Sequence, residues 1–353
     1  MQPISAADSV SLAIERTKEL LFRPFKWSTY LKLGLVAIIT EGLGSNFRSS
    51  APHVDHGAGN GEWHGPSSFP PFFHPTPAMI AIFAAIALAA IVLSILVFYL
   101  ITRLRFAFFH SLTRNIKQIA PGWRLYREQA TRFFWLNIVV GICFMALLVL
   151  VAIPFAAGFW RLFQAHQQGG HFDIGLFLAL VLPLIPIILL LLIVGVLSDL
   201  ILRDWMMPHI ALENATAGEA WRQVRARIAA EKRQFLVYSI LRLILPAIAA
   251  IATFLVLAIP GLLLAGTIGA MEWGIHSAFV GSTGSSWLVG VVLVVFFGLV
   301  AFGFALLASI CIGGPLSTGV REYALIFYGG RYKALGDILY PSQAIVGRAA
   351  GPA

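Results

Sequence analysis

The sequence predicts an all-α fold, a polytopic integral membrane helical bundle of six transmembrane helices with cytoplasmic interfacial helices. Hydrophobic residues make up 59% of the chain and charged residues only 12%, whereas a soluble domain carries roughly 25% charged residues. Six apolar runs separate short polar segments, and most of the runs exceed the roughly 20 residues that cross a hydrocarbon core. The predicted spans are residues 27–43, 78–102, 134–160, 176–202, 243–270 and 287–312.

The distribution of basic residues predicts the orientation of these spans. Of the 25 Lys and Arg residues, 21 fall in alternate segments between the runs and two in the opposite segments, while Lys32 and Arg242 lie inside or at the edge of a span. By the positive-inside rule, both termini are cytoplasmic. The first 26 residues mix charged and apolar positions and do not resemble a cleavable signal peptide. The spans show no alternating pattern of the outer-membrane barrel kind, so we expect a multi-pass protein of the bacterial inner (plasma) membrane.

The segments between the spans divide into helical and irregular ones. Residues 1–26 are predicted to form a cytoplasmic amphipathic interfacial helix, which Pro24 ends. The spans belong to one transmembrane domain, 27–312, with a flexible Gly-, Ser-, Pro- and His-rich outer loop at 44–77. Segments 103–133 and 203–242 are predicted to be helical hairpins, and Thr216 with Glu219 forms a capping box that begins a helix at Ala217. Residues 313–353 are predicted to be a cytoplasmic C-terminal tail.

A weak internal repeat accompanies this order. An interfacial basic helix, an outward span, an outer loop and an inward span occur three times, in units of roughly 100 residues. Two pairs of segments carry the local similarity, "WSTYLKL" with "FLVYSIL" and "LRFAFFH" with "LRDWMMPH". Chance similarity between segments that enter a membrane explains these matches about as well as a true repeat does.

Basic side chains on the predicted cytoplasmic face are candidates for binding anionic lipid headgroups or a membrane partner protein. The alternative is that they only fix the topology, since positive charge is needed there whatever the protein does. We expect a non-enzymatic protein that binds membrane lipids or another membrane protein. The candidate binding residues are Arg105, Arg114, Lys117, Arg124, Arg127, Arg225, Arg227, Lys232 and Arg233.

The alternative function is transport of a small solute. Ionisable residues at membrane depth are costly and indicate function, and Asp199 with Arg242 or Lys32 would line a substrate path near the cytoplasmic boundary. Glu41 is expected near the outer end of the first span. Pro183 and Pro186 predict a broken helix of the kind that exposes backbone ligands in transporters. Snorkelling of Lys and Arg and an ordinary packing kink are the simpler explanations.

Other classes find little support in the sequence. Most histidines lie in the predicted outer loops, and His53 with His56 forms the one tight pair, a weak candidate for metal that a membrane-embedded hydrolase would need. A flexible loop does not hold ligands in the fixed geometry that metals demand, so we expect no metal and no cofactor. Motifs of soluble hydrolases, metalloproteases and nucleotide-binding loops are absent. The net charge of +9 is parcelled into segments that flank spans, so we expect no nucleic-acid partner.

Three segments resemble a known group of membrane proteins. The segments are "LLFRPFKWSTYLKLGLVAI", "RDWMMPHIALENATAGEAWRQVR" with its Asp-x-x-x-Pro and Glu-Ala-Trp spacing, and "GGPLSTGVREYALIFYGG". They are similar to uncharacterised bacterial six-helix membrane proteins related to the membrane domain of glycerophosphodiester phosphodiesterases. The phosphodiesterase chemistry of those enzymes resides in a separate soluble barrel domain. The resemblance therefore implies an α-helical membrane fold and a lipid-associated or accessory role, with no active site.

Overall fold

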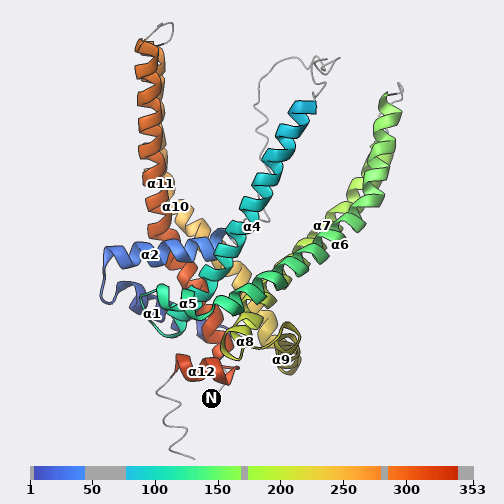
Figure 1. The fold of residues 1–353 in the computed structure, drawn as a ribbon, viewed down its shortest axis with the longest axis vertical. Helices are drawn as coiled ribbons and strands as arrows, with labels where there is room; N and C mark the ends of the chain where they lie inside the picture. The colour runs from blue at the N-terminus through green and yellow to red at the C-terminus, as the bar shows by residue number, and fades with distance from the viewer. Residues whose placement is uncertain (1–3, 44–76, 168–173, 280–284, 341–353) are drawn as a thin grey trace, which may run out of the picture.

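The computed structural model describes residues 4–43, 77–167, 174–279 and 285–340, although it leaves out some side chains between 249 and 287. Every regular element in these ranges is a helix. Three long arms diverge upward from a common base (Figure 1). The first arm is α4 (Pro77–Thr113), the second pairs α6 (Arg127–Gln167) with α7 (Ile174–Leu200), and the third pairs α10 (Lys232–Phe279) with α11 (Ser285–Gly329).

Each long helix has an exposed section in an arm and a buried section in the base. Helix α4 has 37 residues, which makes it about 55 Å long at 1.5 Å per residue. Residues 77–96 of α4 are all exposed, whereas Phe106, Phe109 and Leu112 are fully buried. The exposed section alone is about 30 Å long, which equals the hydrocarbon thickness of a bilayer. The arms are therefore suited to lie in lipid and the base to lie outside it.

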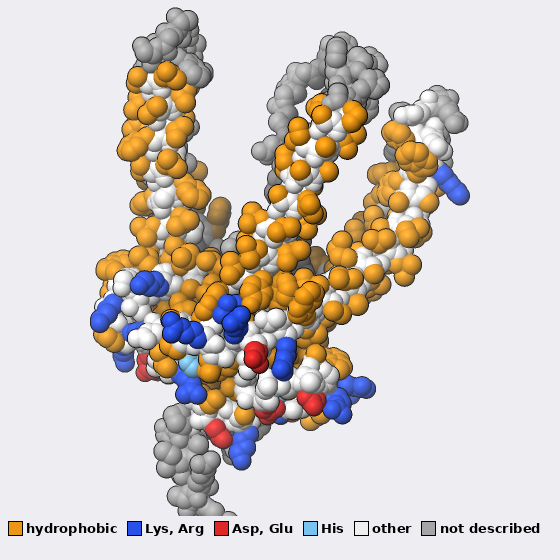
Figure 2. All heavy atoms as spheres, viewed as in Figure 1, with side chains coloured by type: hydrophobic (Ala, Val, Ile, Leu, Met, Phe, Trp, Pro, Cys, Tyr) orange, Lys and Arg blue, Asp and Glu red, His pale blue; other side chains and the backbone are white. Residues whose placement is uncertain are grey.

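Side-chain colouring shows the same division. The arms present an almost continuous apolar surface, and the charged side chains gather over the base (Figure 2). Four helices of the described chain are long and apolar enough to cross a membrane: 77–113, 127–164, 174–212 and 288–329. The described part of the chain is thus all-helical, and the length and composition of these four helices suggest a membrane protein.

Aromatic residues dominate the core of the base. Phe106 and Phe109 of α4 contact Tyr126 beside α5 (Ala120–Leu125). On the opposite side, Tyr238 of α10 stacks on Phe327 of α11 with ring centroids 4.3 Å apart. Such contacts bury large apolar surfaces and fix the mutual rotation of the helices. Short helices complete the base: α8 (Met207–Leu212), α9 (Ala217–Ala230) and α12 (Lys333–Leu339).

The N-terminal helices pack on the base section of α11. Helix α1 (Asp8–Phe22) buries Ala13, Thr17 and Leu20. Helix α2 (Trp27–Ile38) and the π-helical turn η1 (Ile39–Leu43) lie across the lower end of the α11 arm (Figure 1). Gly34 and Gly314 meet at this crossing, where a Cβ added to Gly314 would lie 2.6 Å from the Cα of Gly34. The crossing is close because neither residue has a side chain.

The six-span prediction is not confirmed. Three of the predicted spans, 78–102, 134–160 and 176–202, lie within apolar helices, and the predicted span 287–312 begins one residue before the fourth, 288–329. The predicted first span, 27–43, is divided between α2, of 12 residues, and η1, of 5 residues, and it lies crosswise because it packs on α11. The predicted fifth span, 243–270, lies in α10, whose side chains are only partly described.

The polar segments are helical, as predicted for 103–133 and 203–242. Thr216 and Glu219 form the predicted capping box, with the Thr216 amide donating to Glu219 Oε2 at 2.9 Å. The predicted C-terminal tail differs from the structure, because α11 continues to Gly329 and the segment 321–328 is buried in the base. The predicted outer loop 44–77 lies outside the described residues apart from Pro77.

Candidate functional site

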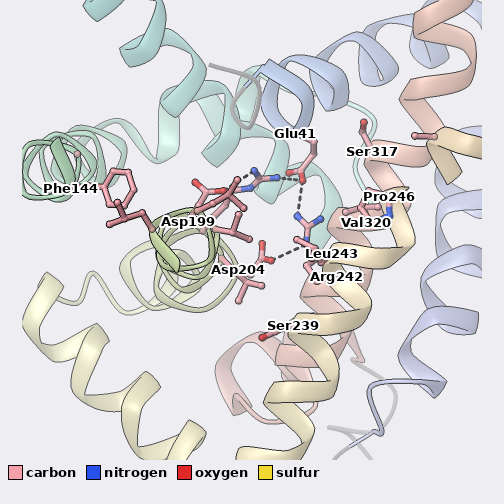
Figure 3. A pocket seen from close by; sticks show the side chains of 18 of the residues that line it. Glu41, Phe144, Asp199, Asp204, Ser239, Arg242, Leu243, Pro246, Ser317 and Val320 are labelled. Carbon is pink, nitrogen blue, oxygen red and sulfur yellow. Dashed lines mark hydrogen bonds and ion pairs between the residues drawn. The ribbon is translucent and has the colours of Figure 1, made fainter. Parts of the chain in front are cut away.

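A chain of ion pairs lies where the arms join the base. Its members come from five helical elements, of which α7 and η2 are contiguous in the sequence, and Figure 3 shows how several of them point toward one another. Positive and negative side chains alternate along this series of ion pairs. The order is Asp199 of α7, Arg203 of the π-helical turn η2 (Ile201–Met206), Glu41 of η1, Arg242 of α10, Asp204 of η2 and Arg321 of α11. We call these six residues the junction cluster.

Each inner carboxylate of the junction cluster binds two guanidinium groups. Asp204 accepts hydrogen bonds from Arg321 Nη1 at 2.7 Å and from Arg242 Nε at 3.0 Å. Glu41 accepts from Arg242 Nη2 at 3.0 Å and from Arg203 Nη2. The side chains of Glu41 and Asp204 are 7% and 2% exposed. Charges buried this deeply are tolerated only when they are paired and hydrogen-bonded.

Two further groups adjoin the junction cluster. The hydroxyl of Tyr238 donates to Asp204 Oδ2 at 2.9 Å. Arg105 of α4 donates from Nε to the carbonyl of Thr40 at 3.2 Å. Its Nη2 atom is buried and has no hydrogen-bond partner among the described residues. Arg105 therefore adds a fourth positive charge beside a cluster whose six members balance.

A pocket of about 1080 Å³ opens between the second and third arms, with the junction cluster at its floor. Its walls come from α6, α7, α10 and α11 and are mostly apolar. The residues that line it are Gly141, Phe144, Met145, Leu148, Ile188, Leu191, Leu192, Gly195, Val196, Leu200, Leu243, Pro246, Ala250, Leu316 and Val320, with Ser239, Ser317 and five members of the junction cluster. The pocket thus offers a long apolar wall above a charged floor.

The nine predicted basic residues divide into two groups. Six of them, Arg114, Arg124, Arg127, Arg225, Lys232 and Arg233, are exposed on the base. The other three make contacts within the protein. Arg105 is buried beside the junction cluster, Lys117 donates to the carbonyls of Arg23 and Pro24, and Arg227 lies 5.1 Å from the ring centre of Tyr332.

The residues of the transport alternative are only partly brought together. Asp199 and Arg242 line the same pocket, but Asp199 pairs with Arg203 and Arg242 pairs with Glu41 and Asp204. The predicted broken helix is wrong. Helix α7 runs without interruption through Pro183 and Pro186, and both prolines are exposed and do not line the pocket. The π-helical distortion occurs instead at η2, eighteen residues after Pro183, where the side chains are packed in the base.

The weak metal candidates His53 and His56 lie outside the described residues. Among the residues that are described, no group of three or more His, Cys, Asp and Glu side chains is placed to hold a metal ion.

A second polar cluster, centred on His209 of α8, lies deeper in the base. His209 is fully buried, and its Nε2 atom lies 3.0 Å from Arg227 Nη1 and 2.7 Å from the Tyr328 hydroxyl. Because a guanidinium nitrogen can only donate, Nε2 must be the acceptor, and the imidazole proton resides on Nδ1, which faces Glu213. Burial alone would raise the pKa of Glu213, but hydrogen bonds from Gln223 and His209 lower it. This cluster joins α8, α9 and α11 and does not line the pocket.

Residues 4–338 match the model of a family described as "Family of unknown function (DUF7544)". The chain belongs to this family. The match covers all three arms and the base, so the junction cluster lies entirely within the family region. It provides no link to glycerophosphodiester phosphodiesterases, and the expected relation to their membrane domain is not supported. No curated protein and no solved structure matches the chain.

Sequence reasoning missed four members of the junction cluster as site residues. Arg203 and Asp204 were assigned to a cytoplasmic loop, Arg321 to the tail, and Glu41 to the outer end of a span. Glu41 lies instead at the floor of the pocket, because α2 and η1 lie across the base. One feature of the sequence could have indicated these residues. An Arg-Asp pair directly follows a long apolar run, and both charges need partners if the helix continues into a packed region.

Proposed function

We propose that this member of the DUF7544 family is a non-enzymatic protein of the bacterial inner membrane that binds a phospholipid in the pocket between the second and third arms. The observation that carries the proposal is the combination of an apolar wall and a charged floor in one pocket. A phospholipid has the same two parts, acyl chains and a charged headgroup. Its headgroup would meet the junction cluster while its chains lie along α6, α7 and α10.

The position of the pocket along the arms supports this proposal. Its floor lies where the exposed apolar sections end and the buried base begins, which is the level expected for headgroups. With the positive-inside rule, the base and both termini face the cytoplasm, and the bound lipid belongs to the inner leaflet. The exposed basic residues of the base would then face anionic headgroups around the protein. These contacts are additional to the pocket and do not require a specific lipid.

The test uses a variant that fills the pocket without disturbing its walls. Gly141 lines the pocket, and a Cβ added there meets nothing within 4 Å. We expect Gly141→Phe to reduce the lipid that is retained when the full-length protein is gently extracted from its own membrane and examined by native mass spectrometry. The matched control is Gly298→Phe on the α11 arm, where an added Cβ also meets nothing within 4 Å and which does not line the pocket.

The outcome separates binding in the pocket from general association with lipid. Loss of a discrete bound mass in Gly141→Phe but not in Gly298→Phe supports the proposal. Equal retention of lipid by the wild type and both variants contradicts it.

A transporter of a small solute is the second candidate, because Asp199 and Arg242 both line the pocket. This function predicts that Asp199→Asn abolishes uptake of the transported solute into cells, while the amount of the variant protein in the membrane equals that of the wild type. Unchanged uptake in this variant would count against transport.

A further inference from the structure

Asp199 differs from the other carboxylates of the junction cluster in its pairing. It is the first residue in the series of ion pairs that forms the junction cluster. Its ion-pair partner is Arg203, and Arg203 Nη1 lies 3.6 Å from Asp199 Oδ2. The pairs of Asp204 with Arg242 and Arg321 are shorter, at 3.0 and 2.7 Å. The side chain of Asp199 is 32% exposed, and it lines the pocket. A carboxylate in this position can accept hydrogen bonds from a ligand without losing a strong internal pair.

Arg242 is the cation that a ligand in the pocket reaches most readily. Its side chain is 13% exposed, against 6% for Arg203 and 3% for Arg321. Its bonds to Asp204 and Glu41 are made by Nε and Nη2. Nη1 takes part in neither bond, so its N–H groups can donate to a ligand oxygen. The pocket therefore presents one accessible negative group and one accessible positive group on the same floor (Figure 3).

We infer that the pocket selects a phospholipid whose headgroup carries a primary ammonium beside its phosphate, with the phosphate at Arg242 and the ammonium at Asp199. This inference rests on the proposed function, because it names the class of lipid that the proposed site takes. A primary ammonium has three N–H donors, and Asp199 is an acceptor whose partly exposed side chain lines the pocket. Guanidinium and phosphate groups form charge-assisted hydrogen bonds of the same kind.

The same chemistry discriminates against other headgroups. A trimethylammonium headgroup carries the same charge but has no N–H donor, so it cannot hydrogen-bond to Asp199. A glycerol headgroup offers hydroxyl donors but no positive charge, so the lipid keeps a net negative charge next to the Asp199 carboxylate. Ethanolamine lipids should therefore bind more tightly than choline or glycerol lipids that have identical acyl chains.

The experiment compares headgroups at constant acyl chains. The full-length protein is stripped of lipid in detergent and offered an equal mixture of ethanolamine, choline and glycerol phospholipids, and the bound lipids are counted by native mass spectrometry. We expect the wild type to favour the ethanolamine lipid over the glycerol lipid by about fivefold, the ratio that a partly exposed ion pair supplies. A similar ratio is expected over the choline lipid, which keeps the charge but loses the charge-assisted hydrogen bond. Asp199→Asn should bind the three lipids nearly equally, and Asp199→Glu should restore the preference. Asp337→Asn on α12, outside the pocket, is the matched control and should behave as the wild type.

The outcomes separate this inference from the proposed function. Equal binding of the three lipids to the wild type, or an unchanged preference in Asp199→Asn, overturns the headgroup inference; the phospholipid site itself still stands if Gly141→Phe removes the bound lipid. Absence of any discretely bound lipid from the wild type overturns both. The wild-type comparison needs no variant, so the inference stays testable even where Asp199→Asn does not fold.

Discussion

At the residue scale, the burial of Glu41 depends on side chains from other helices. Its carboxylate accepts from Arg203 and Arg242, which come from η2 and α10. Removing one member of a buried ion pair leaves an uncompensated charge in a region of low dielectric, which costs more than the pair itself contributes. Glu41 is therefore expected to matter for folding as well as for the floor of the pocket.

We predict that Glu41→Gln lowers the free energy of unfolding by about 3 kcal/mol, since a buried ion pair that loses one partner is destabilised by that order. Denaturant unfolding of the purified protein in detergent measures the change. Glu15→Gln, an exposed carboxylate of α1, serves as the control and should change little.

The pairing itself can be examined with a second substitution. The double variant Glu41→Gln with Arg242→Gln should lose less stability than the two single variants added together, because both changes act on one contact and are not additive. Simple additivity of the two single effects would mean that Glu41 and Arg242 do not stabilise one another.

At the element scale, the burial of the segment 202–211 could not be predicted from the sequence. All ten of these residues are buried, although Arg203, Asp204 and His209 would suit a solvated loop. Arg203 pairs with Glu41, Asp204 pairs with Arg242 and Arg321, and His209 accepts a hydrogen bond from Arg227, so these partners are 18 to 162 residues away. The contacts of Arg203 with Asp199 and of His209 with Glu213 span only four residues each, and no local pattern contains the longer ones. The capping box at Thr216 was predictable because both partners lie within one helical turn.

The crossing of α2 and α11 is an element-scale feature that can be tested with glycine substitutions. Gly314→Ala should destabilise the protein by about 1–3 kcal/mol, the usual cost of overpacking, because its Cβ would meet the backbone of Gly34. Thermal unfolding in detergent measures the effect. Gly319→Ala on the same helix is the matched control, since its Cβ would meet only Thr17 Oγ1 at an ordinary 3.6 Å. If both variants lose the same stability, close approach of α2 is not the reason for Gly314.

At the scale of the whole molecule, the amphipathic division into arms and base was predictable and the arrangement of the arms was not. The apolar runs and the one-sided basic residues indicated helices in a membrane with the charge on one face. The crosswise position of α2 depends on the Gly34–Gly314 contact with a segment about 280 residues later. The two glycines are far apart in the sequence, and neither composition nor periodicity indicates that they meet.

The orientation leads to a prediction for the intact molecule. With Cys143 and Cys311 replaced by serine, a cysteine introduced at Arg225 on the base should react with a membrane-impermeant maleimide in inside-out vesicles only. One introduced at Arg161, near the far end of α6, should react in right-side-out vesicles only. The opposite pattern would invert the orientation given by the basic residues, and labelling of both positions from one side would contradict a spanning second arm.

The divergence of the three arms leaves their facing surfaces to the surrounding bilayer. Above the base, the second and third arms are separated (Figure 1), and both present exposed apolar side chains. In a membrane, lipid chains would fill this gap. Asp199 and Arg242 lie at the lower ends of the two arms, on α7 and α10. The packed base, and not the arms, therefore determines the spacing between these two opposite charges.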